Sequence, residues 1–145
     1  MKIYSYTLND YQRIMEIWDS AVLATHHFLD QDYFLKLKEI IPNEFLPQLD
    51  LFVIEDEGIK GFMAIASDRL EMLFVDGSAR GKGYGSRLLA YAVNELGVTK
   101  VDVNEQNEQA RHFYLAKHFV VASRTEKDSL GYDYPILKLS LRSKS

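Results

Sequence analysis

Apolar and polar residues alternate at the start of the chain and then recur with the period of a helix. The alternation over residues 2–8 predicts a first strand. Apolar residues at helical spacing from Ile14 onward predict a helix that ends near Thr25. A second helix is predicted over 31–40, because the residue before Pro42 is biased away from helical geometry.

The middle of the chain reads as a run of three strands joined by tight turns. Strands are predicted over 50–55, 59–66 and 70–75, where apolar residues dominate. Turn-forming residues separate these strands at 56–58 and at 67–69. The first two strands therefore form a hairpin, which the third extends into a meander.

The second half of the chain alternates helices with strands. After a glycine-rich loop over 76–85, a helix is predicted over 86–96, a strand over 100–103, a helix over 107–117, and strands over 119–124 and 134–141. The order β-αα-βββ-α-β-α-ββ predicts an α/β fold, with a mixed sheet of six to seven strands and helices on both faces. At 145 residues the chain is expected to form a single domain over 1–145.

Composition narrows the classes of function. The chain has no cysteine, which excludes disulfides, thiolate metal sites and a cysteine nucleophile. The net charge of −4 argues against a general nucleic-acid binder. The N-terminus lacks the apolar run of a signal peptide, and no stretch approaches the roughly 20 apolar residues of a membrane span. We therefore expect a cytoplasmic protein without nucleic-acid or membrane partners.

The segment 80–85, RGKGYG, carries the clearest chemical signal and lies between a predicted strand and a predicted helix. Its glycines allow a ligand to approach the backbone closely. Successive N–H groups at a helix N-terminus form an anion site, which the helix dipole strengthens. Arg80 and Lys82 add positive charge. The segment therefore indicates a pyrophosphate-binding loop.

Two nucleotide-binding patterns fit this loop poorly. A P-loop requires Ser or Thr directly after its lysine, whereas Lys82 is followed by Gly83. A Rossmann fingerprint requires a third glycine, and the corresponding residue is Ser86. Asp102 lies about 20 residues further on, which leaves a dinucleotide-binding alternative open. Against it, the loop glycines come well after the predicted strand end at Val75.

Two further matches coincide with the order of the elements. Arg80, Gly83 and Gly85 fit the pattern (R/Q)-x-x-G-x-(G/A), and residues 107–114, NEQARHFY, fit N-x-x-A-x-x-x-Y. Loop, helix and element order together resemble the GNAT (Gcn5-related) N-acetyltransferases over nearly the whole chain. The spacing within 107–114 also favours a functional interpretation of Tyr114, which on an amphipathic helix would otherwise be read as a core residue.

The resemblance extends to one subgroup of the family and breaks at one residue. Residues 24–29, ATHHFL, and 103–110, VNEQNEQA, resemble the small YjaB-like acetyltransferase subgroup. His118 stands where the family pattern usually has the glycine that ends a helix in a left-handed conformation. His118 is expected to cost about 1 kcal/mol of local stability relative to glycine, and its presence leaves the geometry of this turn open.

The resemblance implies acetyl-CoA as the cosubstrate. No cluster of His, Asp or Glu in the sequence suggests a metal. The resemblance also implies that the Val75 backbone N–H polarises the thioester carbonyl, and that Phe74 and Val75 line the pantetheine arm. Asn107 would contact the arm or an ordered water, and Tyr114 would protonate the departing sulfur. The pyrophosphate would be held by the backbone N–H groups of Arg80, Gly81, Lys82, Gly83, Tyr84, Gly85 and Ser86.

Acetyl transfer also needs a base, because a lysine-like amine has a pKa near 10.4. Glu71 is one candidate, directly or through water, since strand alternation predicts that it shares a face with Val75; the competing interpretation is a solvated carboxylate. His26 is a candidate for catalysis and substrate contact, against a role at the end of the first helix. Asp102 and Asn104 are candidates for binding the amine, and Asp102 is also a rival base.

The reading favoured by these features is an N-acetyltransferase that moves an acetyl group from acetyl-CoA to a primary amine by direct attack. The alternative is a non-catalytic sensor module that binds acyl-CoA or a nucleotide, for which Tyr114 and a base would be unnecessary. The acceptor is either a small-molecule amine or a protein amine, and the acidic charge balance leans toward a cationic one. The sequence neither requires nor excludes a homodimer.

Overall fold

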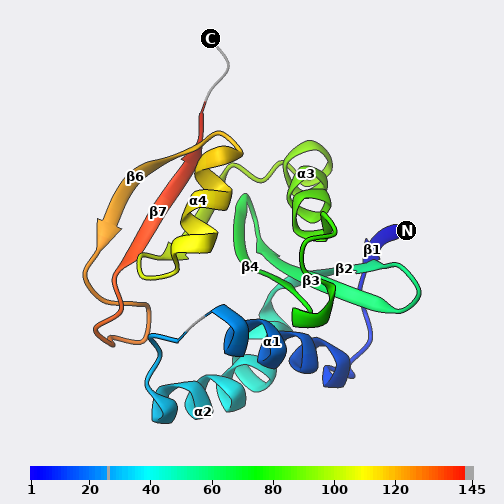
Figure 1. Ribbon diagram of the computed structural model, residues 1–145, viewed down its shortest axis with the longest axis horizontal. Helices are drawn as coiled ribbons and strands as arrows, with labels where there is room; N and C mark the ends of the chain where they lie inside the picture. Colours follow the sequence, from blue (N-terminus) through cyan, green and yellow to red (C-terminus); the bar gives the residue numbers. More distant parts are fainter. Residues whose placement is uncertain (26, 143–145) are drawn as a thin grey trace. The chain divides into compact units, whose positions relative to one another are not determined.

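Figure 1 shows the computed structural model of the protein, which describes residues 1–25 and 27–142. The chain divides into two compact units, unit 1 (Met1–Val98) and unit 2 (Thr99–Ser145). Unit 1 contains β1 (Lys2–Ser5), α1 (Gln12–Thr25), α2 (Gln31–Ile40), β2 (Asp50–Glu55), β3 (Ile59–Ala66), β4 (Arg69–Val75) and α3 (Tyr84–Leu96). Unit 2 contains β5 (Lys100–Asn104), α4 (Glu108–Ala116), β6 (Phe119–Thr125) and β7 (Ile136–Leu141). This is the predicted order of elements; the expectation of a single domain stays a prediction.

The four strands of unit 1 form an antiparallel sheet in the order β1-β2-β3-β4. On one face of β3, Phe62 packs in a cluster with Ile14 and Trp18 of α1. On the other face, a Cβ placed on Gly61 would lie 3.4 Å from the Leu88 side chain of α3. Figure 1 accordingly shows α1 and α3 on opposite sides of these strands. β3 in the middle of this sheet is therefore buried on both faces, in keeping with its near-continuous apolar run.

Several element boundaries differ from the predicted ones. β1 ends at Ser5, and Leu8 lies beyond the strand with 65% of its surface exposed. The alternation over 2–8 therefore marks a strand only in its first half. Helical structure continues past α2 as a π-helical turn (Ile41–Phe45) and a 3-10 turn (Leu46–Gln48). Proline is tolerated in the first turn of such a segment, because its missing N–H would have no helical partner there. α3 begins at Tyr84, earlier than predicted.

Asp76 joins the end of β4 to α1 and to the loop that follows. Its carboxylate accepts hydrogen bonds from Arg13 Nη2 at 2.8 Å, and from the backbone N–H and hydroxyl of Ser78 at 3.0 and 2.8 Å. The Ser20 hydroxyl oxygen accepts the Gly77 N–H at 2.9 Å, and a Cβ on Gly77 would lie only 2.7 Å from that oxygen. The backbone hydrogen bond from Ser78 is the largest of the effects that lower the pKa of Asp76.

We expect the Asp76→Asn variant to lose about 2 kcal/mol of unfolding free energy at pH 7, because a turn cap and a hydrogen-bonded partner of Arg13 are weakened together. The folded pKa of Asp76 is lowered, so its contribution is present above the unfolded pKa of about 3.9 and is lost as pH falls through the folded value. Urea unfolding of both proteins should therefore give a constant difference from about pH 5 to 8 and a shrinking difference below about pH 4. A difference independent of pH down to about pH 3 would contradict this role.

The three strands of unit 2 form an antiparallel sheet in the order β5-β7-β6. α4 packs against β5 and β6, and the ring of Tyr114 meets the ring of Phe119 edge-on at 6.0 Å between centroids. Phe119 is 1% exposed, whereas the rest of β6 is largely open to solvent. The core of unit 2 is therefore centred on the aromatic contact between α4 and the start of β6.

His118 connects α4 to β6 with a positive φ of 74°, so the turn keeps the left-handed conformation although glycine is replaced. Its N–H donates to the Leu115 carbonyl at 3.3 Å, and its carbonyl accepts the Arg142 N–H at 2.8 Å. We expect His118→Gly to keep or raise the unfolding free energy by up to about 1 kcal/mol. We expect His118→Val to lower it by about 1–2 kcal/mol, because a β-branched residue is strained in this region. Thermal unfolding of both variants checks the order Gly above His above Val, and a reversed order would show that the side chain of His118 stabilises the turn.

Candidate active site

The predicted pyrophosphate loop joins η3 (Gly77–Ala79) to α3, and its backbone conformation requires glycine. Gly81 and Gly83 have positive φ values of 80° and 82°. Gly83 is the N-cap of α3, and no side chain caps the helix there. The first intrahelical bond to this cap runs from the Arg87 N–H to the Gly83 carbonyl at 3.1 Å. The N–H groups of the first turn thus have no acceptor within the helix, which is the geometry an anion needs.

The side chain of Tyr84 links this turn to the sheet of unit 1. It is 5% exposed, and its hydroxyl donates to Asp56 Oδ2 at 2.7 Å, in the turn between β2 and β3. From the sequence, we expect only the backbone N–H of Tyr84 to act in the loop. Asp56 is expected only to form part of a turn. The structure shows that this pair fixes the start of α3 to the sheet of unit 1, and therefore fixes the direction of the helix N-terminus.

The backbone of Val75 is oriented as the oxyanion role requires. The Asp76 N–H donates to the Lys60 carbonyl at 2.9 Å, and Val75 lies opposite Gly61 in the register of β3 and β4. In an antiparallel ladder, bonded and non-bonded pairs alternate, so Val75 and Gly61 form a non-bonded pair. The N–H of Val75 therefore points away from β3, toward the open side of β4 within unit 1.

The side chains at the end of β4 divide between two faces. Phe74 packs against Phe62 at 5.8 Å between ring centroids, on the face of the sheet that α1 covers. Val75 lies on the opposite face, because successive side chains of a strand alternate. The predicted lining of the pantetheine arm by both side chains would thus draw on two faces of β4, and the side chain of Phe74 has a packing role in the core.

Glu71 lies at a β-bulge in β4. Met72 pairs with Ala64 and Leu70 pairs with Ile65, so Glu71 is an extra residue without a Cα partner on β3. A bulge interrupts the alternation of side chains and redirects one of them. Simple alternation along β4 therefore does not assign Glu71 to the face of Val75, and the role of Glu71 stays a prediction. The side chain of Glu71 is exposed, and bulges are frequent beside active sites.

In unit 2, Asn107 and Tyr114 lie on one face of α4, seven residues apart. Asn107 is 9% exposed and caps the helix, since its Oδ1 accepts the Ala110 N–H at 3.2 Å. Tyr114 is 6% exposed, and its ring also meets Phe113 edge-on at 5.2 Å. Burial is the sole cause that raises the pKa of Tyr114, so the phenol holds its proton throughout the neutral range.

The remaining candidates have structural partners or cannot be described. Asp102 of β5 forms an ion pair with Lys138 of β7, which lies directly opposite it, at 3.3 Å. The Oδ1 of Asn104 accepts the Gln106 N–H at 3.0 Å and so shapes the turn before α4. His26 lies outside the described residues. The amine-binding roles predicted for these residues stay predictions.

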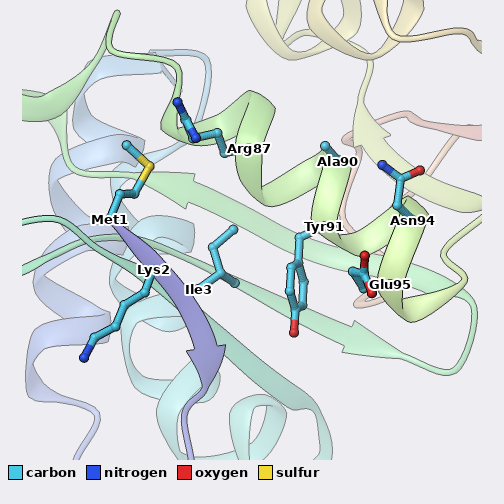
Figure 2. Close-up of a pocket in the computed structure, with 8 residues that line it drawn as sticks. All are labelled: Met1, Lys2, Ile3, Arg87, Ala90, Tyr91, Asn94 and Glu95. Carbon is cyan, nitrogen blue, oxygen red and sulfur yellow. The ribbon is translucent and has the colours of Figure 1, made fainter.

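A shallow depression of about 400 Å³ lies between β1 and the outer side of α3 (Figure 2). Its lining comes from Met1, Lys2, Ile3, Arg87, Ala90, Tyr91, Asn94 and Glu95. It shares no residue with the predicted donor or acceptor sites. Within the described ranges, no group of three or more His, Cys, Asp or Glu side chains could hold a metal ion. No helix of residues 1–25 or 27–142 is long and apolar enough to cross a bilayer.

Comparison with known proteins decides the family. The family model for the acetyltransferase (GNAT) domain matches residues 47–121. Peptidyl-lysine N-acetyltransferase YjaB from Salmonella typhimurium strain LT2 is 38% identical over 131 residues, which are 88% of this chain and 89% of that protein. The chain belongs to the GNAT family of acetyltransferases.

Two solved structures show the same fold. The solution structure of apo YjaB from Escherichia coli has a TM-score of 0.87 and 33% sequence identity, and the match covers 99% of this chain and 100% of that chain. The structure of yncA from Salmonella typhimurium with its cofactor acetyl-CoA has a TM-score of 0.63 and 21% identity, with 100% of this chain and 96% of that chain covered. The predicted GNAT fold, of the α/β class with seven strands, is confirmed.

Membership of this GNAT family settles the class of reaction. The protein is an N-acetyltransferase with acetyl-CoA as its donor, as predicted from the loop and the 107–114 stretch. The dinucleotide-binding alternative, which rested on Asp102, is thereby set aside, and so is the non-catalytic sensor. The roles of individual residues are not decided by membership and depend on the geometry above.

Proposed function

We propose that the acceptor of this N-acetyltransferase is the ε-amino group of a lysine in a protein. The observation that carries the proposal is the identity of 38% with a protein named as a peptidyl-lysine N-acetyltransferase, over most of both chains. A second relative, YiaC from Escherichia coli, is also named as a peptidyl-lysine N-acetyltransferase. It is 26% identical over 79% of this chain. The net charge of −4 supports a cationic acceptor as well.

In the proposed reaction the neutral lysine nitrogen attacks the thioester carbonyl directly. An N–C bond forms, the C–S bond breaks, the acetyl group passes to the amine, and CoA leaves as the thiol. The outward-pointing N–H of Val75 donates to the oxyanion, and Tyr114 gives its proton to the departing sulfur. The proton that the nitrogen loses as the amide forms restores the phenol of Tyr114. The N–H groups from Arg80 to Ser86 hold the pyrophosphate. Orientation of the two substrates supplies much of the remaining rate.

Glu71 is our proposed base, acting through a water molecule on the lysine ammonium. Its exposed position on the bulge of β4 supports this role, because the bulge places a carboxylate on the same strand that carries the Val75 N–H. Asp102 is a weaker candidate, since its carboxylate already pairs with Lys138. His26 is the alternative base and substrate contact that the sequence suggests.

Peptide acetylation followed by mass spectrometry tests the acceptor. Matched peptides would carry one internal lysine with a blocked N-terminus, a free N-terminus without lysine, or neither amine. We expect acetylation of the first peptide, and little of the second and third. Free polyamines and amino acids would serve as small-molecule acceptors in parallel. Turnover of these at rates above the lysine peptide would show that the acceptor is a small-molecule amine.

A further inference from the structure

Arg111 carries a buried hydrogen-bond donor that no group satisfies. Its Nε is inaccessible to solvent and has no hydrogen-bonding partner among the described residues. The same guanidinium has one weak ion pair, in which Nη2 lies 3.9 Å from Glu108 Oε1, and the side chain as a whole is 29% exposed. Native proteins rarely leave a buried donor unpaired, because the lost hydration is not recovered. We therefore expect a bound molecule to supply the hydrogen-bond acceptor that the Nε–H of Arg111 lacks.

The position of Arg111 on α4 indicates which partner that is. Arg111 follows Asn107 by four residues and precedes Tyr114 by three, so the three side chains lie along one face of the helix. The family resemblance assigns Asn107 to the pantetheine arm and Tyr114 to the sulfur of the donor. Arg111 lies between these two residues. Its N–H groups therefore face the stretch of the pantetheine arm that leads to the sulfur.

We infer that Arg111 is a further donor-binding residue, whose Nε–H donates to an amide carbonyl oxygen of the pantetheine arm of acetyl-CoA. The inference rests on the roles proposed for Asn107 and Tyr114. A neutral carbonyl fits better than a phosphate, because the Glu108 carboxylate beside Nη2 repels an anion. A phosphate would also engage the guanidinium through two N–H groups at once, whereas a single buried N–H is unpaired here.

The Arg111→Met variant separates this role from a structural one. Methionine fills similar volume, favours helices and removes the unpaired donor. We expect the free variant to unfold at the same temperature as the parent protein or higher, and to bind acetyl-CoA about tenfold more weakly by calorimetry. KM for acetyl-CoA should rise by a similar factor while kcat changes less than about twofold. Arg111→Lys keeps the charge without the Nε–H and should lose affinity to the same extent.

Arg124→Met is the matched control, since it removes one arginine charge from β6, where Arg124 pairs with Glu105 at the surface. An equal loss of affinity in this control, or unchanged affinity in Arg111→Met, would overturn the inference. Acetyl-pantetheine, which lacks the phosphates, should show the same loss of kcat/KM in Arg111→Met as acetyl-CoA does. A loss confined to acetyl-CoA would assign Arg111 to a phosphate and overturn its contact with the arm. Absence of acetyl-CoA binding by the parent protein would instead remove the proposed donor site itself.

Discussion

Replacing Tyr114 by phenylalanine should lower kcat by about two orders of magnitude and leave the affinity for acetyl-CoA unchanged. A positioned general acid contributes roughly 10²–10⁴ to a rate, and the burial of Tyr114 keeps its phenol protonated in the neutral range. The variant retains the ring contacts with Phe113 and Phe119, so its fold should persist. Release of CoA can be followed with a thiol reagent, because the protein contains no cysteine.

A second tyrosine on a different helix provides the control for this substitution. Tyr91 of α3 contacts Phe52 at 5.9 Å between ring centroids and has no proposed role in the reaction. Tyr91→Phe should therefore retain kcat within about twofold. An unchanged kcat in Tyr114→Phe would remove Tyr114 as the acid. Equal losses in both variants would indicate a general effect of losing a hydroxyl.

Replacing Gly83 by alanine should weaken acetyl-CoA binding by at least about tenfold, because a Cβ would stand where the backbone meets the pyrophosphate. The free protein has open space at this position, with no atom within 4 Å of an ideal Cβ. The cost to folding is then the backbone penalty of a positive φ alone, about 1 kcal/mol. Calorimetric titration and thermal unfolding measure the two effects separately.

Gly97 at the other end of α3 is the matched control for Gly83. It has a φ of 71°, also with no atom within 4 Å of an added Cβ, and it lies in no proposed site. Gly97→Ala should lose about the same unfolding free energy, on the order of 1 kcal/mol, and bind acetyl-CoA normally. Parallel losses of binding in both variants would mean that strain in α3, and not the approach of the ligand, explains the effect.

Features carried by neighbouring residues were predictable from the sequence. The glycine pattern of 80–85 predicted the loop, and the pattern over 107–117 predicted the helix that carries Asn107 and Tyr114. Local chemistry of this kind depends on spacings of a few residues, which the sequence displays directly.

Features that depend on register or on distant contacts were not predictable. The bulge at Glu71 arises from the pairing of β4 with β3, and alternation along one strand does not reveal it. Asp76 meets Arg13 across 63 positions of sequence, and Tyr84 meets Asp56 across 28. The unpaired Nε of Arg111 is visible only when burial and hydrogen bonds are known. For Asp76 and Tyr84, packing selected one partner among many of equivalent residue type.

The most direct test of the account is calorimetric titration of the purified protein with acetyl-CoA, with NADH titrated in parallel. The account predicts saturable binding of acetyl-CoA at a single site and no binding of NADH, because the chain belongs to the GNAT family of acetyltransferases. A folded sample that fails to bind acetyl-CoA, or that prefers NADH, would contradict the central claim and return attention to Asp102 and a dinucleotide site.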